Sequence, residues 1–213
     1  MNEPYTDDEQ VEKLKSWWKS YGNALVLGIA LGVAIVFGNK YWTGYKKERA
    51  EAASVIYDRL ITDYHNKAFD TVRASGTTLI ENYAATPYAG LAAMILARVS
   101  FDEGKNEEAR RQLQWAVENA TDNGTRHAAR LRLARLLIND NELESALALI
   151  AIEDIAGFEA DYHELRGDIE AAKGNKAQAR QEYQQALKYL SVSSSYRAVL
   201  NMKLDDLGPE TAQ

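Results

Sequence analysis

The side chains best suited to acid–base or metal chemistry in this chain are three histidines, and they are scattered along the sequence. His65, His127 and His163 fall in different predicted helices. The strongest metal-like group is His163 with Asp161 and Glu164. Side chains that share one helix face are three or four residues apart, so this spacing does not direct three ligands at one ion. The sequence therefore predicts no metal site.

Other patterns that carry catalysis are missing from the sequence. The chain has no cysteine, no HExxH motif, no glycine-rich phosphate loop and no G-x-S-x-G nucleophile motif. Acidic pairs such as Glu107 and Glu108 are interpreted as helix-end or solvated charges, because negative charge stabilises helix N-termini. From Lys40 onward 26 acidic residues outnumber 22 basic ones, which argues against a nucleic-acid-binding surface. The sequence predicts neither an enzyme nor a bound cofactor.

The organisation of the chain begins with an uncharged window between two aromatic pairs. Trp17 and Trp18 precede the window Ser20–Asn39, and Tyr41 and Trp42 follow it. These twenty residues make about 30 Å of helix, which matches the hydrocarbon core of a bilayer. Aromatic rings at both ends are typical of the two membrane interfaces. The window therefore predicts one membrane-spanning helix.

The predicted span divides the chain into a tail over residues 1–22, a transmembrane helix over 23–42 and a domain over 43–213. A cleavable signal peptide is the alternative, but the leading 22 residues are acidic rather than basic, so an uncleaved anchor is favoured. Charge does not settle the orientation, since three lysines precede the span and four basic residues closely follow it.

Two features near the span predict contacts outside the chain. The segment Thr6–Glu9 matches a capping box, and apolar residues including Leu14 and Trp18 then share one face. This pattern predicts an amphipathic helix in the membrane interface, with a solvated helix as the alternative. Gly28 and Gly32 form a small-residue pair that predicts lateral contact with another membrane helix, whereas a plain anchor would need no such contact.

After the span, one short pattern recurs three times. It opens at Gly104, Asn141 and Gly174 and closes on an alanine five residues later, and the copies are 37 and 33 positions apart. Glycine or asparagine suits a left-handed residue that ends one helix, and the alanine lets the next helix pack closely. A helix–turn–helix unit with a period of about 34 residues is the signature of tetratricopeptide-type repeats.

These repeats predict an all-α protein in which one N-terminal transmembrane helix is followed by a tetratricopeptide-like helical-hairpin solenoid of about four helix pairs. A hairpin over 45–64 and 67–83 precedes the patterned units and lacks their glycine. A helix near 194–207 is expected to cap the stack, because a solenoid needs a terminal element with a polar outer side. A plain helical bundle is the alternative, and successive hairpins stacked in register would exclude it.

Stacked hairpins of this kind line a groove with their first helices, and such a groove suits an extended or helical peptide. The alternative for Arg98 and Arg135 is a surface ion pair, with Asp102 in the case of Arg98. The alternative for Leu91 and Leu131 is a place in the core between hairpins. The consensus inner positions predict these partner-binding residues: Met94, Arg98, Phe101, Leu131, Arg135, Ile138, Glu164 and Asp168, with Leu91 and Asp161 beside them.

The chain also carries a family resemblance that covers nearly its whole length. The string Tyr5–Glu12, the segment Leu14–Lys19 and the end of the span, Gly38–Trp42, resemble the YfgM family, the ancillary subunits of the bacterial SecYEG translocon. The resemblance implies an inner-membrane protein with a cytoplasmic N-terminus and a periplasmic repeat domain. It further implies association with SecYEG, with a PpiD-type periplasmic chaperone, with secreted client proteins and with the Rcs stress-response regulator.

Two functions without catalysis fit these features. The first is a translocon-associated adaptor or co-chaperone that helps hand secreted proteins to periplasmic chaperones. The second is a structural scaffold that organises another envelope complex. They differ in whether the groove meets an unfolded client or a folded partner, and the sequence leaves that choice open.

Overall fold

The computed structural model describes residues 7–208, including the side chains of residues 11–208 except 24, 29 and 30. Over this range the chain is helical, with helices α1 to α9 joined by turns and loops and with no strand among the described residues. The chain divides into two compact units, Met1–Arg49 and Ala50–Gln213, and helix α1 (Asp7–His65) contributes to both.

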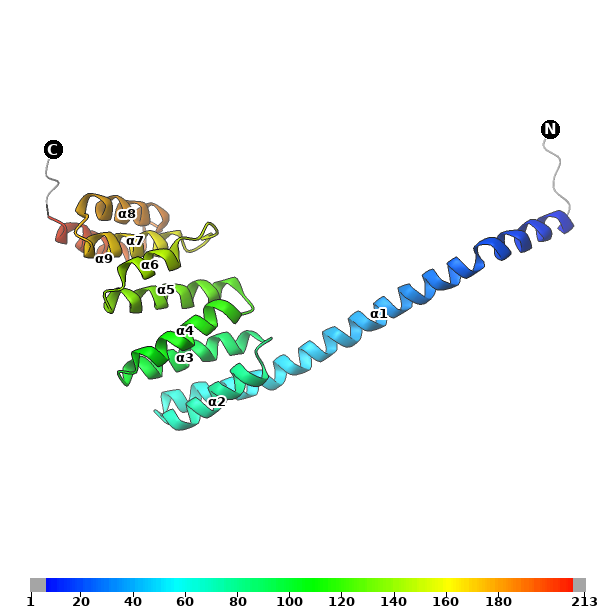
Figure 1. Cartoon of the computed structure of the whole chain (residues 1–213), viewed down its shortest axis with the longest axis horizontal. Helices are drawn as coiled ribbons and strands as arrows, with labels where there is room; N and C mark the ends of the chain where they lie inside the picture. Colours follow the sequence, from blue (N-terminus) through cyan, green and yellow to red (C-terminus); the bar gives the residue numbers. More distant parts are fainter. Residues whose placement is uncertain (1–6, 209–213) are drawn as a thin grey trace, which may run out of the picture. The chain divides into compact units, whose positions relative to one another are not determined.

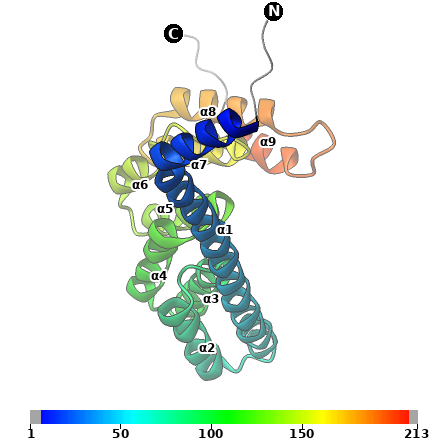
Figure 2. The same ribbon diagram turned by 90° about the vertical axis from the view of Figure 1, so that its right-hand side faces the viewer.

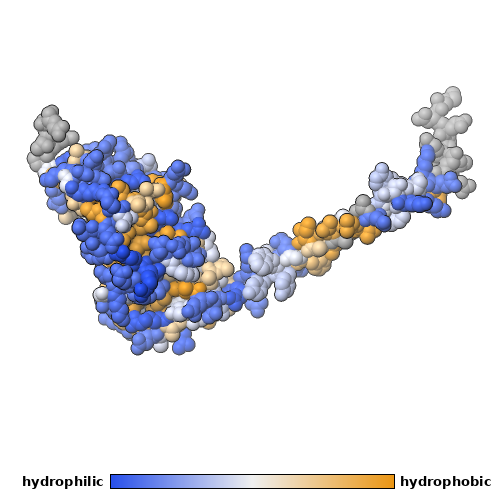
Figure 3. All heavy atoms as spheres, in the orientation of Figure 1, coloured by the Kyte–Doolittle hydropathy of each residue, from blue (hydrophilic) through white to orange (hydrophobic). Residues whose placement is uncertain are grey.

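The described part of the first unit is the leading part of α1, and its large apolar side chains are exposed. Figure 3 shows hydrophobic side chains gathered in a band along this helix. Within Leu25–His65 an 18-residue window has a mean hydropathy of 1.6, and none of it is buried. By length and composition the helix can therefore cross a bilayer.

Aromatic rings lie on both sides of this apolar stretch. The ring centroids of Trp17 and Tyr21 are 6.0 Å apart on one side, and those of Trp42 and Tyr45 are 6.1 Å apart on the other. The ammonium of Lys46 lies 5.3 Å from the ring centroid of Trp42. Each end thus carries amphipathic rings of the kind that settle at a membrane interface.

Three further predictions for this unit concern the capping box, the glycine pair and the limits of the membrane span. Thr6, which opens the expected capping box, lies outside the described residues. Gly28 and Gly32 are exposed, and no atom lies within 4 Å of a Cβ placed on either. They leave room for a second helix, and contact with one stays a prediction. Helix α1 is unbroken through the expected boundaries at 22 and 42, so those membrane limits also stay predictions.

The second unit is a stack of helical hairpins, which confirms the predicted fold class. First helices of successive hairpins contact each other, α3 with α5 and α5 with α7. The second helix of a hairpin also contacts the first helix of the next one, α2 with α3 and α4 with α5. This order, visible in Figures 1 and 2, excludes a plain bundle. After the end of α1 the helices are α2 (Phe69–Asn82), α3 (Pro87–Asp102), α4 (Asn106–Asn119), α5 (Asn123–Asn139), α6 (Leu143–Ile150), α7 (Glu159–Ala172), α8 (Lys176–Tyr189) and α9 (Arg197–Asp206).

The turns inside the hairpins have the predicted left-handed residues. Gly104, Asn141 and Gly174 have φ values of +75°, +62° and +83°. In the first hairpin, which lacks the glycine, Lys67 takes the same role with φ +58°. A left-handed residue ends the first helix of each pair and reverses the chain, so each hairpin forms from local sequence.

Small residues let the paired helices approach closely. The three patterned alanines, Ala109, Ala146 and Ala179, are each exposed by 1% or less. A Cβ added to Gly167 on α7 would lie 2.4 Å from the Tyr183 ring on α8, so only glycine fits beneath that ring. The period-34 pattern is thus a pattern of helix–helix contacts.

The last helix closes the stack, as predicted. Leu200 of α9 is buried with Ala179, Tyr183 and Ala186 of α8 in one hydrophobic cluster. Helix α9 begins and ends within the expected range of 194–207. It therefore covers apolar surface that the fourth hairpin would otherwise expose.

Candidate partner-binding groove

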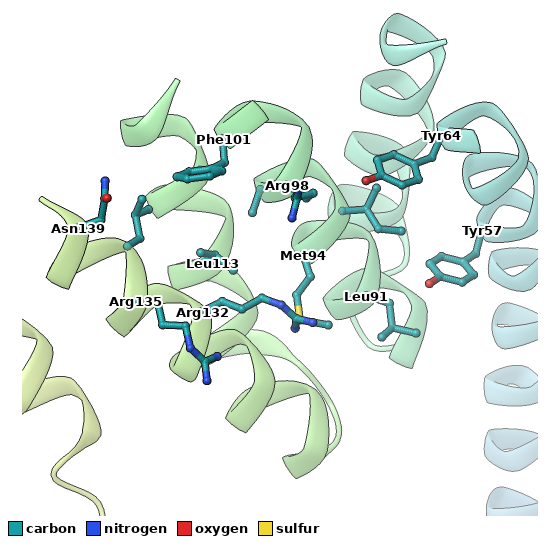
Figure 4. Close-up of a pocket in the computed structure, with 14 residues that line it drawn as sticks. Tyr57, Tyr64, Leu91, Met94, Arg98, Phe101, Leu113, Arg132, Arg135 and Asn139 are labelled. Atoms are coloured by element: carbon teal, nitrogen blue, oxygen red, sulfur yellow. The ribbon is translucent and has the colours of Figure 1, made fainter. Parts of the chain in front are cut away.

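A groove of about 630 Å³ opens on the second unit, among helices of its first three hairpins (Figure 4). Most of its lining comes from the first helix of each hairpin, with a smaller share from α4. We call it the inner groove, and its lining residues are Tyr57 and Tyr64 from α1, Leu91, Met94, Ile95, Ala97, Arg98 and Phe101 from α3, Ala109 and Leu113 from α4, and Arg132, Arg135, Leu136 and Asn139 from α5.

Helix α3 supplies one wall of the inner groove. Leu91, Met94, Arg98 and Phe101 recur at intervals of three and four residues, which puts them on one face of the helix. On another face Ala93 is fully buried in a cluster of small side chains from α3, α4 and α5. This close packing fixes the position of the wall.

The floor of the groove is apolar. Leu113 and Leu136 are each 5% exposed, and Leu91 and Met94 are partly buried. Phe101 is 45% exposed at the groove, a high value for a large aromatic side chain. An apolar floor with an exposed ring is suited to the side chains of a partner protein.

Two arginines of the rim form ion pairs at the surface. Arg98 Nε donates to Asp102 Oδ2 at 2.8 Å, and this hydrogen bond raises the pKa of Arg98 above its ordinary value. Arg135 Nη2 lies 4.0 Å from Asp161 Oδ1, at the outer limit of an ion pair. The Arg98 and Arg135 side chains are 65% and 45% exposed. Exposed pairs of this kind contribute little stability, so both guanidinium groups stay open to another acid.

The third arginine has a weaker partner. Arg132 Nη1 donates to the thioether sulfur of Met94 at 2.9 Å, and Figure 4 shows the two side chains meeting across the groove. A thioether is a weak acceptor. Among the described residues no carboxylate lies within ion-pair distance of Arg132. Its charge is therefore not neutralised by a neighbouring acid in the described structure.

The side of the groove away from Arg132 and Arg135 carries two tyrosines of α1 that are seven residues apart (Figure 4). The Tyr57 ring packs on Tyr88 of α3, with centroids 5.4 Å apart at an interplanar angle of 42°. Burial, with the nearby Asp58 charge, raises the pKa of Tyr57 above its ordinary value. Tyr64 lies on the same side (Figure 4). Rigid rings with polar tips add binding area at low entropic cost.

A comparison with protein families accounts for this architecture. The model of the tetratricopeptide repeat-like domain family matches residues 15–209, which is most of the chain. The chain belongs to this family. The tetratricopeptide repeat-like domain is a protein-interaction domain and not an enzyme, in agreement with the sequence analysis.

Several relatives carry one name over almost the same length. A protein of Escherichia coli (strain K12) named "Ancillary SecYEG translocon subunit" is 28% identical over 201 residues, covering 94% of this chain and 96% of its own. Proteins of the same name from Haemophilus influenzae and Neisseria gonorrhoeae are 27% and 28% identical, and each match covers 94% of this chain and 97% of theirs. These matches confirm the resemblance to ancillary translocon subunits.

Half of the predicted partner-binding residues meet in the inner groove of the tetratricopeptide repeat-like domain. They are Met94, Arg98, Phe101 and Arg135, with Leu91 beside them. Their role in binding a partner stays a prediction. The alternative for Arg98 is also present in the structure, since it pairs with Asp102 as the four-residue spacing allows.

Of the three residues predicted on α5, Arg135 lines the inner groove and the structure places Leu131 and Ile138 elsewhere. Leu131 is 3% exposed in the main core cluster, and Ile138 packs against that cluster, so neither lines the groove. The lining residues of α5 are instead Arg132, Arg135 and Asn139, which with Leu136 lie at three- and four-residue intervals. Leu131 is apolar and therefore favours the core over the groove, which is the alternative that the sequence left open for this residue.

Glu164 and Asp168 were also expected in the groove, and the structure places them under α9. Lys203 Nζ donates to Glu164 Oε1 at 2.6 Å and to Asp168 Oδ1 at 2.7 Å. Tyr196 and Tyr183 donate to the same two carboxylates, at 2.7 Å and 2.8 Å. Glu164 is only 3% exposed, so these acids hold the capping helix rather than line the groove.

Four polar residues of the lining were not predicted: Tyr57, Tyr64, Arg132 and Asn139. The two tyrosines lie on the first helix of the hairpin predicted over 45–64 and 67–83, to which no groove residue was assigned. Their seven-residue spacing is the available signal, because it puts both rings on one face of α1.

The histidines have structural partners. His127 is buried, its Nδ1 lies 2.9 Å from the Tyr162 hydroxyl, and its ring stacks on Phe158 at 4.8 Å. His163 Nδ1 lies 2.7 Å from Glu182 Oε2. Across the described residues, no three potential metal ligands gather. His127 of α5 thus contacts α7 and the connection that precedes it, and His163 of α7 contacts α8.

Proposed function

We propose that the chain is a membrane-anchored adaptor of the SecYEG translocon. In this proposal the apolar part of α1 holds it in the bacterial inner membrane with a cytoplasmic N-terminus. The tetratricopeptide repeat-like domain then lies in the periplasm. There it binds protein segments and helps hand secreted proteins to a PpiD-type chaperone, and contact with the Rcs regulator is a further part of the proposal.

One observation carries the proposal more than any other. A chain similar over 94% of its length to proteins named ancillary SecYEG translocon subunits has an open groove with an apolar floor and an arginine rim. A groove of this kind suits an extended or helical peptide. Met94 adapts to varied side chains, and arginine is over-represented at binding hot spots.

The association itself is tested by co-purification. The full chain, tagged at its C-terminus, is isolated from detergent-solubilised membranes, and the SecY, SecE and SecG subunits are quantified by mass spectrometry. The proposal predicts their enrichment over a control anchor of matched abundance. Enrichment of other envelope proteins without translocon subunits would favour the scaffold function.

The orientation is tested with introduced cysteines, since the natural chain has none. Glu12→Cys places a thiol at an exposed position before the apolar stretch, and Glu153→Cys places one at an exposed position after it. In intact spheroplasts a membrane-impermeant maleimide is expected to label Glu153→Cys at once and Glu12→Cys only after lysis. The reverse pattern would contradict a periplasmic repeat domain.

The membrane segment provides a separate test. Gly28→Leu with Gly32→Leu fills the open face of α1, where no atom lies within 4 Å of either Cβ position. We expect this pair of changes to reduce co-purification of translocon subunits if α1 contacts another membrane helix. Gly44→Leu is the matched control, because Gly44 is equally open. Equal effects of both would remove the predicted lateral contact.

A further inference from the structure

We propose that the inner groove selects protein segments in which acidic side chains alternate with apolar ones. This inference rests on the proposed function and adds the chemistry of the ligand to it. The groove is lined by Arg98, Arg132 and Arg135, and none of its described lining residues is acidic. Apolar side chains of a ligand would contact the floor, and carboxylates would meet the arginine rim.

The charge of the groove is not offset by strong internal pairs. In the described part of the chain, Arg132 Nη1 donates to the Met94 thioether sulfur at 2.9 Å and has no carboxylate partner. Arg135 lies 4.0 Å from its acid, at the limit of contact. A ligand carboxylate is a better acceptor than a thioether and carries a full opposite charge, so carboxylates of a ligand can bind the guanidinium groups of Arg132 and Arg135.

The acidic part of the neighbouring hairpin is already occupied by the chain itself. Glu164 and Asp168 of α7 are bound by Lys203 of α9, at 2.6 Å and 2.7 Å. A basic ligand therefore finds these carboxylates engaged. Within the described lining of the inner groove, the charged groups open to a ligand are positive.

The geometry also separates the inner groove from other surface arginines. Arg111 lies in a different hollow, on α4, where it pairs with Glu108 three residues away. It is 69% exposed, close to the 65% of Arg98. Arg111→Gln is thus a matched control that removes one exposed arginine without touching the inner groove.

The experiment measures fluorescence anisotropy of labelled peptides with the full chain in phosphatidylcholine nanodiscs. The probe is a fluorescein-labelled peptide in which glutamates alternate with leucines and phenylalanines, and two companion peptides carry glutamine or lysine instead of glutamate. We expect the glutamate peptide to bind about tenfold tighter than the glutamine peptide, and the lysine peptide to bind most weakly. Raising the salt should reduce this preference, because the arginines are exposed.

Variants locate the preference on the rim. Arg132→Gln with Arg135→Gln should weaken binding of the glutamate peptide about tenfold and leave the glutamine peptide nearly unchanged, whereas Arg111→Gln should change neither. Asp102→Asn releases Arg98 from its pair and should strengthen binding of the glutamate peptide about twofold. Thermal unfolding of each variant checks that the fold is kept.

The results separate this inference from the proposed function. Equal binding of the glutamate and glutamine peptides, or equal losses in Arg111→Gln and the double variant, would overturn the acidic preference. Co-purified SecYEG subunits in the same preparations would then leave the translocon proposal standing. Acidic selectivity without any translocon subunit would support the inference and count against the proposed function.

Discussion

Replacing Lys203 with methionine is expected to destabilise the C-terminal end of the hairpin stack. Lys203 Nζ donates at 2.6 Å to Glu164 and at 2.7 and 2.8 Å to the two carboxylate oxygens of Asp168. Glu164 is 3% exposed. Without the ammonium, the described side-chain donors to these acids are the hydroxyls of Tyr196 and Tyr183. Two neighbouring carboxylates then lack a compensating charge.

The expected loss follows from the burial of this cluster. Removing one partner of a buried ion pair costs about 3–5 kcal/mol. The side chains of Lys203 and Asp168 are 29% and 25% exposed, so water screens part of the interaction. A loss of about 2–3 kcal/mol in the free energy of unfolding is expected, between the values for exposed and buried pairs. For a chain of this size that lowers Tm by about 4–12 °C, measured by circular dichroism of the full chain in detergent.

The matched control is Lys188→Met, because Lys188 is exposed and its ammonium donates a long hydrogen bond, 3.3 Å, to the neutral amide oxygen of Gln185. It should leave Tm unchanged. Glu164→Gln combined with Lys203→Met should cost less than the two single changes added together, since it also removes the uncompensated charge. If Lys203→Met unfolds at the same temperature as Lys188→Met and the natural chain, the cluster does not hold α9 and this reasoning is wrong.

Three further changes test other parts of the fold by thermal or urea unfolding of the full chain. Gly167→Ala should lower stability by about 1–3 kcal/mol, because its Cβ would lie 2.4 Å from the Tyr183 ring; no loss would show that the ring is free to move. Hydrogen bonding to Arg73, the larger of two basic contributions, lowers the pKa of Glu103 from 4.5 to about 2. Its stabilising effect is therefore present above pH 4.5 and lost as the pH falls toward 2, so Glu103→Gln should flatten stability against pH in that window. Burial lowers the pKa of His127 below 6.5, so the fold is favoured above that pH and loses stability as the pH falls. His127→Gln should reduce the drop in Tm between about pH 7.5 and about pH 5.5, and an undiminished drop would assign it to other groups.

The hairpins could be predicted because their determinants are local. The left-handed residues Gly104, Asn141 and Gly174 and the small residues that follow them lie within a few positions of each other. A turn and a close helix contact are fixed at these positions whatever the rest of the chain does. The first hairpin was placed without this signal, and Lys67 adopts the same left-handed backbone there.

The groove was only partly predictable because its residues come from helices far apart in the sequence. On α5 the consensus favoured Leu131, but burial in the core rotates that face inward and leaves Arg132 at the groove. The position of Glu164 depends on Lys203, 39 residues later. No local pattern distinguishes an acid that lines a groove from one that holds the next helix, because the partner belongs to another element.

Photo-crosslinking in cells tests whether the inner groove binds the partners of a translocon adaptor. A benzophenone amino acid replaces Phe101, which is 45% exposed at the groove, and a second probe replaces Arg111 outside it. We expect the Phe101 probe to capture SecYEG subunits, a periplasmic chaperone or secreted precursors. We also expect Arg132→Gln with Arg135→Gln to weaken this capture. If the Phe101 and Arg111 probes give the same products and neither contains a translocon subunit, chaperone or precursor, the groove is not the partner-binding site of a translocon adaptor.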